Sequence, residues 1–266
     1  MEALIKAGRL TFAVGLTGLA LQQFYFPGFR PVFIPAWPAW LPFSQLFTYL
    51  TSFGLIVCAA SIVFNFKPYK TQLILGLVFL LMLLAFHIPF NIAQQTTSLG
   101  GWTNTFKLLA FSGAAFVVAG SYLYDVETIQ MRHVEKLIPL GSIFFGVMMF
   151  VFGVDHFLYH QFVKTLVPLW IPYPLFWTYF AGIALVGAGI SFIFKIKVKP
   201  VGILTSIMLF LWFLILHIPR AVTMPADADN GNEITSVFQA LAFSGIALLI
   251  ALDSESKSKK DVTVNH

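Results

Sequence analysis

The sequence predicts an all-helical protein embedded in a membrane, and three observations support this prediction. Of the 266 residues, 58% are hydrophobic and only 10% are charged, whereas soluble domains carry roughly 25% charged residues. Apolar runs of about 20 residues, the length that crosses a bilayer as a helix, recur along the chain. Two of these runs end in the same tripeptide, His-Ile-Pro, at residues 87–89 and 217–219. We therefore expect an all-α, polytopic membrane protein that is built from two related halves.

Eight segments of the chain are long and apolar enough to span a bilayer as helices. They cover residues 5–27, 45–66, 71–92, 105–124, 137–160, 176–195, 200–220 and 236–252. In both His-Ile-Pro copies the proline lacks an N–H, so it leaves the carbonyl four residues earlier without its helical partner. Each histidine is therefore expected on a locally weakened stretch of helix near a membrane surface.

The basic residues predict how the eight segments are oriented. They gather at alternate connections, at Lys6, Arg9, Lys67, Lys70, Arg132, Lys136, Lys195, Lys197, Lys199, Lys257, Lys259 and Lys260. Loops on the cytoplasmic side of a membrane carry an excess of such residues. We therefore expect a multi-pass protein of a bacterial cytoplasmic (inner) membrane with both termini in the cytoplasm.

The two halves align along most of their length at an offset of 130 to 133 residues. Gly8–Phe24 aligns with Gly141–Phe157, and Leu109–Gly113 aligns with Leu241–Gly245. Because four helices return the chain to its starting side, the halves should be parallel and related by a pseudo-twofold axis along the membrane normal. The predicted units are a first four-helix unit at 1–125, a second at 137–252, and a disordered cytoplasmic tail at 253–266.

A segment rich in proline and aromatic residues, 26–43, joins the first two helices and has a shorter counterpart in the second half. Proline at this density excludes a regular helix. We expect a folded interfacial cap on the outer face in each half, either lying at the surface or re-entrant, and two interpretations of its role remain open. It is either an interfacial anchor or a lid over a lateral cavity.

The polar residues within the spans are the candidates for function, because ionisable groups are costly inside a membrane. They fall near the outer ends of the helices, and the cytoplasmic half is almost entirely apolar. This depth disfavours a proton or ion path across the bilayer. The tentative ligand-binding residues are His87, His217, Asp155, His156, Lys107 and Arg220.

Two narrower hypotheses concern Asp155 and His156. A buried carboxylate is tolerated mainly when it is paired, so Asp155 is expected beside Arg220, Lys107 or His217, either to hold a ligand or to clamp the two halves together. His156 and His160 lie four residues apart, a spacing that suits zinc or iron. No metal site is expected, however, because the first half does not repeat the pair.

The sequence excludes several classes of function. The single cysteine, Cys58, allows neither a disulfide nor a dithiol redox pair within this chain. The net charge of +5 is spread over the connections and not gathered in a patch, so no nucleic acid partner is expected. No phosphate-binding loop and no nucleophile motif of hydrolases is present.

The short motifs resemble those of the DoxX/DoxD membrane family. In that family a Gly-Arg-Leu opens the first helix, as Gly8-Arg9-Leu10 does here. A histidine near the outer end of the third helix matches His87 and His217, and a Lys that precedes a Leu-Ala-rich stretch matches Lys107. The resemblance covers nearly the whole chain as two fused copies. The second copy departs from it, with Ser142 and Gln239 in place of the Arg and the Lys.

The resemblance implies a membrane subunit associated with an oxidoreductase, such as the quinone-reducing system of thiosulfate oxidation. We expect a redox-associated protein that binds a quinone-like or lipidic ligand in an outer-leaflet pocket. Quinone is the cofactor considered, and no catalytic residue is assigned. The alternative is a non-catalytic scaffold or accessory subunit that docks a periplasmic or membrane partner. In both cases the lipid bilayer is the surrounding partner.

Overall fold

The computed structural model describes residues 1–26, 28–39, 41–122, 132–224 and 231–264, with side chains at 132–133 and 254–264 excepted. Within these ranges the chain is helical and contains no strand. The elements are α1 (Glu2–Tyr25), α2 (Ser44–Val63), α3 (Pro68–Met82), η1 (Leu83–His87), α4 (Ile88–Ala93), η2 (Leu99–Trp102), α5 (Thr103–Ser121), α6 (Arg132–Glu135), η4 (Ile138–Leu140), α7 (Gly141–Leu158), α8 (His160–Val163), η5 (Lys164–Leu166), α9 (Pro174–Phe194), α10 (Val198–Trp212), η6 (Phe213–His217), α11 (Ile218–Thr223) and α12 (Asn232–Val264).

Seven helical stretches in the described part of the chain are long and apolar enough to cross a membrane. They are Glu2–Tyr25, Ser44–Val63, Pro68–Ala93, Ile138–Leu158, Pro174–Phe194, Val198–Thr223 and Asn232–Asp253. Their outer faces are apolar as well, because Phe53, Ile183 and Leu204 each expose more than 60% of their surface. A shell of exposed large apolar side chains is not tolerated in water. The chain is therefore a membrane-embedded, multi-pass protein.

The eighth expected span is α5, which is less apolar than the other seven. It begins with Thr-Asn-Thr and carries Lys107 in its second turn. Its middle, from Ala110 to Phe116, is buried against other helices. A helix that faces protein along most of its length has little need of an apolar exterior.

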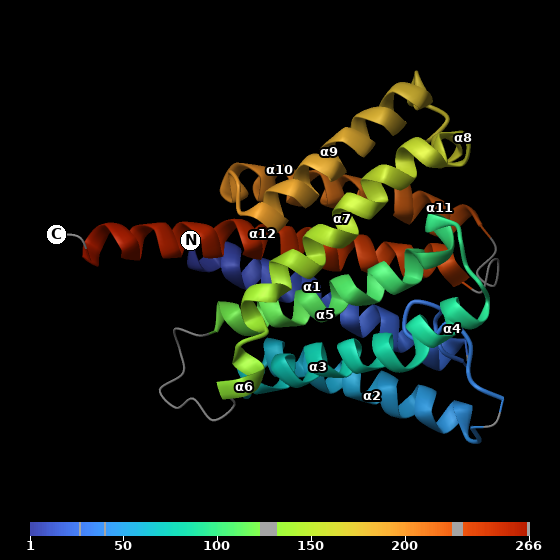
Figure 1. The fold of residues 1–266 in the computed structure, drawn as a ribbon, viewed down its shortest axis with the longest axis horizontal. Helices are drawn as coiled ribbons and strands as arrows, with labels where there is room; N and C mark the ends of the chain where they lie inside the picture. Colours follow the sequence, from blue (N-terminus) through green and yellow to red (C-terminus); the bar gives the residue numbers. More distant parts are fainter. Residues whose placement is uncertain (27, 40, 123–131, 225–230, 265–266) are drawn as a thin grey trace.

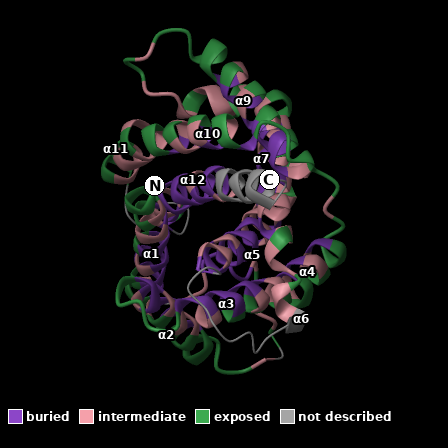
Figure 2. Ribbon diagram, turned by 90° about the vertical axis from the view of Figure 1, so that its left-hand side faces the viewer, coloured by how far each residue is buried: buried purple, intermediate pink, exposed green. Residues whose placement is uncertain are grey.

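The helices form one bundle in which the first helix of each half packs against the last helix of the other half. α1 packs against α12, and α7 packs against α5, while α5 and α12 meet at the centre. Figure 2, which looks along the bundle, shows buried residues concentrated on these central helices and exposed residues on the outer ones. Figure 1 places both ends of the chain at the same end of the bundle.

Glycines make these two exchanged crossings close. A Cβ added at Gly8 would lie 2.9 Å from the carbonyl oxygen of Gly245, and one added at Gly141 would lie 2.7 Å from that of Gly113. Small residues allow membrane helices to approach in this way. The sequence aligns Gly8 with Gly141 and Gly113 with Gly245. The two crossings therefore use the same pair of aligned positions.

In each His-Ile-Pro motif the histidine is the last residue of one turn of π-helix. The backbone N–H of Ile88 donates to the carbonyl of Leu83, and that of Ile218 donates to the carbonyl of Phe213. The proline after each isoleucine can make no such bond and crowds the preceding turn, so the wider turn accommodates it. The weakened stretch expected from the sequence is thus a π-turn that ends on the histidine in both copies.

Part of the segment at 26–43 enters the bundle, while most of its other described residues are half-buried or exposed. Val32, Phe33 and Ile34 are almost fully buried. The Phe33 ring stacks on Phe79 at 5.7 Å between centroids and lies 6.1 Å from the ring of Phe111. The part from 32 to 34 is a plug in the core of the first half, which corresponds to the re-entrant arrangement of the expected cap.

The C-terminal part also differs from expectation. α12 continues as a helix to Val264, although the polar composition after residue 252 suggested a disordered tail. No glycine or proline follows Ala251 to end the helix. The expected boundary of the first unit, residue 125, lies outside the described residues.

Candidate ligand-binding site

A cavity of about 770 Å³ lies among the helices of the second half and the start of α5. Its walls are mostly apolar and come from α7, α9, α10 and α12, with Met148, Phe152, Trp177, Met208 and Trp212 among them. Polar groups from α5, η6, α11 and α12 occur at one end. A cavity of this size and character suits a small amphiphile.

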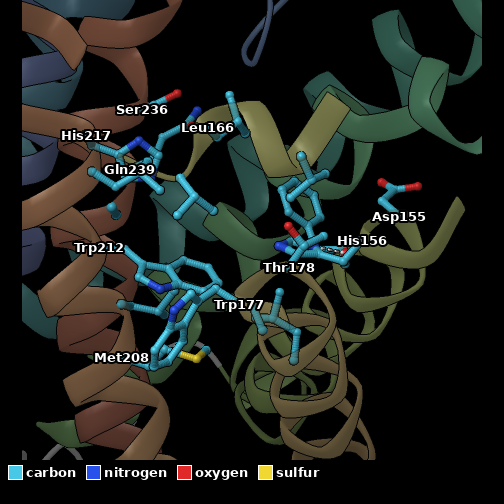
Figure 3. A pocket seen from close by; sticks show the side chains of 18 of the residues that line it. Asp155, His156, Leu166, Trp177, Thr178, Met208, Trp212, His217, Ser236 and Gln239 are labelled. Carbon is cyan, nitrogen blue, oxygen red and sulfur yellow. Dashed lines mark hydrogen bonds between the residues drawn. The ribbon is translucent and has the colours of Figure 1, made fainter. Parts of the chain in front are cut away.

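Five of the six residues predicted from the sequence line this cavity: Lys107, Asp155, His156, His217 and Arg220. The prediction rested on their similar depth near the outer ends of different helices. Tertiary packing brings them to one space. Figure 3 shows His217 with Gln239 and Ser236 on one side, and His156 with Thr178 across from them.

His217 lies at the polar end without a hydrogen bond to its Nδ1 atom. That atom is buried and finds no partner among the described residues. Lys107, Arg220 and Glu233 are close enough to act on the ring electrostatically. A buried polar atom that lacks a partner costs about 1–3 kcal/mol, so a ligand that supplies the missing bond would recover that free energy.

Gln239 provides a second unpartnered polar group. Its side chain is only 4% exposed, and its Nε2 atom has no partner in the described part of the chain. An amide N–H can only donate a hydrogen bond. The cavity therefore presents a buried donor that requires an acceptor.

The ion pair at the site differs from the expected one. Arg220 binds Glu233 through two bonds, Nη2 to Oε1 at 2.5 Å and Nε to Oε2 at 3.1 Å. Asp155 instead keeps one carboxylate oxygen without a partner among the described residues. Asp155 and His156 are consecutive on a helix and so point about 100° apart, which separates the carboxylate from His217 (Figure 3).

His156 is fixed by its own helix. Its Nδ1 donates to the carbonyl of Phe152 at 2.7 Å, and its ring stacks on Trp212. The Nδ1 of His160 bonds the carbonyl of Phe157, and His160 does not line the cavity. In the described ranges, no three His, Cys, Asp or Glu side chains are grouped as metal ligands.

His87, the sixth predicted residue, lies outside the cavity in the core of the first half. It is 1% exposed. Its Nε2 lies 3.2 Å from the carbonyl oxygen of Phe33, and its Nδ1 lies 3.3 Å from the hydroxyl of Thr105. Asn91 donates to the same hydroxyl at 2.9 Å. Because the Phe33 carbonyl can only accept, Nε2 carries the proton and Nδ1 accepts from Thr105.

Among the polar residues of the cavity that sequence reasoning missed are Glu233, Ser236 and Gln239. Gln239 had been noted only as the residue that replaces a Lys. Its place at the outer end of the expected span 236–252, near the depth of His217, was the available signal. Glu233 lay in a loop-like stretch and gave no sign that it begins α12 and pairs with Arg220.

Comparisons with protein-family models, with curated proteins and with solved structures give no match to this chain. The site is therefore interpreted from its own geometry.

Proposed function

We propose that this protein binds a lipophilic ligand, quinone-like or lipidic, in the cavity of its second half. The observation that supports this most directly is the pair of unpartnered buried groups, His217 Nδ1 and Gln239 Nε2, at the polar end of an otherwise apolar cavity. An amphiphile with an acceptor on its head and an apolar body satisfies both parts of the site. The apolar walls exclude a strongly hydrated substrate.

The proposal includes eight spans in two parallel four-helix units. The exchanged packing of α1 on α12 and α7 on α5, at aligned glycines, supports the repeat. By the positive-inside rule, the basic connections and both termini lie on the cytoplasmic side of the membrane. The polar end of the cavity then lies in the outer leaflet. The α5 helix is then the fourth span of the first unit, and it lies inside the bundle.

A redox role as the membrane subunit of an oxidoreductase remains part of the proposal. Its support is the resemblance of the motifs to the DoxX/DoxD family and the polarity of the site. Absence of any co-purifying quinone, together with no reduction of added quinone, would contradict this part.

The binding proposal is tested by extracting the purified protein with organic solvent and identifying co-purifying lipophiles by mass spectrometry. The Ser236→Trp variant fills the cavity from α12 and should lose the enriched compound. Asn104→Trp, at the aligned position of α5 and outside the cavity lining, is the matched control and should keep it. The same compound at the same ratio in both variants would contradict the proposal.

A further inference from the structure

In the first half, the chain itself occupies the space beside the histidine. Phe33 presents its carbonyl to His87 and its ring to Phe79 and Phe111. The plug is held in place by its own turn, in which the N–H of Phe33 bonds the carbonyl of Arg30 at 2.8 Å. The amide N–H of Arg30 in turn donates to Gln23 on α1 at 3.3 Å.

In the second half, the residues that align with this arrangement line the cavity. Leu166, Leu209 and Phe243 align with Phe33, Phe79 and Phe111, and all three line it. Leu166, in η5, is half-buried, whereas Phe33 is fully buried in the core. The space that Phe33 fills in one half is thus open in the other.

The groups that orient His87 are also missing from the second half. Thr105 aligns with Val237, and Asn91 aligns with Ala221. Neither replacement can hydrogen-bond a ring nitrogen through its side chain. His217 therefore aligns with His87 but lacks the Thr-type partner of Nδ1, in keeping with its own Nδ1, which has no partner in the described part of the chain.

We infer that the ligand of the second half reproduces the plug of the first half as a separate molecule: a carbonyl oxygen against His217 and a flat apolar ring between Leu209 and Phe243. This inference rests on the proposed function and narrows its ligand to a lipophilic compound whose carbonyl is attached to a ring. Gln239 supplies a further donor at the same end. A lipid with hydrocarbon chains alone provides the apolar body but no ring for the position of Phe33.

The test uses benzophenone, a ring-bearing ketone that labels neighbouring C–H groups when illuminated. Protein in detergent micelles is labelled, and the labelled peptides are identified by mass spectrometry. Labels are expected on the stretches 205–220 and 232–245. Two competitors of nearly the same shape are then compared: acetophenone, which has the carbonyl, and α-methylstyrene, which has a CH₂ group in its place.

Acetophenone is expected to suppress the labelling about tenfold more effectively than α-methylstyrene, the factor that one buried hydrogen bond supplies. His217→Ala should abolish this preference and leave labelling by ring binding. His160→Ala, which changes a histidine outside the cavity lining, should retain the preference.

Labelling within the cavity with equal competition by both compounds would overturn the inference and leave the proposed function standing. Labelling that avoids residues 205–220 and 232–245 altogether would overturn both. Because the competition is measured on the unmodified protein, the outcome does not depend on the folding of any variant.

Discussion

Replacing the two aligned histidines by alanine should change stability by very different amounts. His87→Ala removes a ring that accepts from Thr105 and donates to the Phe33 carbonyl, both in the buried core. Each buried polar group left without its partner costs about 1–3 kcal/mol. A loss of about 3 kcal/mol in the free energy of unfolding is therefore expected, together with loosening of the plug.

His217→Ala removes a ring whose Nδ1 has no partner in the described part of the chain. No hydrogen bond of Nδ1 to the described residues is lost, and an unpartnered polar atom is removed together with part of the buried apolar surface. The change in the free energy of unfolding should stay within about 1 kcal/mol.

The assay is unfolding in a detergent titration with sodium dodecyl sulfate, followed by tryptophan fluorescence. Thr105→Val gives the first half the residue found at the aligned position of the second half, Val237. This variant should lower the free energy of unfolding by about 1–2 kcal/mol, because the hydroxyl that donates to His87 Nδ1 is removed. Equal destabilisation by His87→Ala and His217→Ala would refute the reasoning, since it would mean that both histidines serve packing alone.

Two further predictions concern helix packing and the ion pair. Gly113→Ala should lower the free energy of unfolding by about 1–3 kcal/mol, because the added Cβ would lie 2.5 Å from the Gly141 carbonyl oxygen. The control is Gly54→Ala, which has open space around it and should be neutral or slightly stabilising in the same detergent titration. A double-mutant cycle with Arg220→Met and Glu233→Gln should give a coupling energy of about 1 kcal/mol. The value is modest because the side chains of this bidentate pair are 27% and 20% exposed. A coupling energy indistinguishable from zero would contradict the paired geometry.

Much of the architecture could be read from the chain before the structure. Apolar run length identifies spans because a helix in lipid must satisfy its backbone internally and present an apolar surface. Seven of the eight expected segments meet that description in the structure, and α5 is the least apolar because it lies inside the bundle. The depth of Lys107, His156 and His217 along their helices was also sufficient to place them at one end.

The direction in which each side chain points could not be read in the same way. Run length gives the depth of a residue but not which neighbour its helix face meets. Asp155 was therefore expected beside Arg220, Lys107 or His217, and of these Arg220 pairs instead with Glu233 at the start of α12. The exchange of first and last helices between the halves, which sets those neighbours, leaves no mark on local periodicity.

The sequence by itself determined the membrane class, the apolar spans and the two aligned histidines, because these follow from composition and local spacing. Only the tertiary structure decided that the two histidines differ. A short segment inserts Phe33 beside His87, while the aligned Leu166 is only half-buried and lines the cavity that His217 also lines. The difference depends on whether a loop turns into the core, and that depends on contacts between residues far apart in the chain.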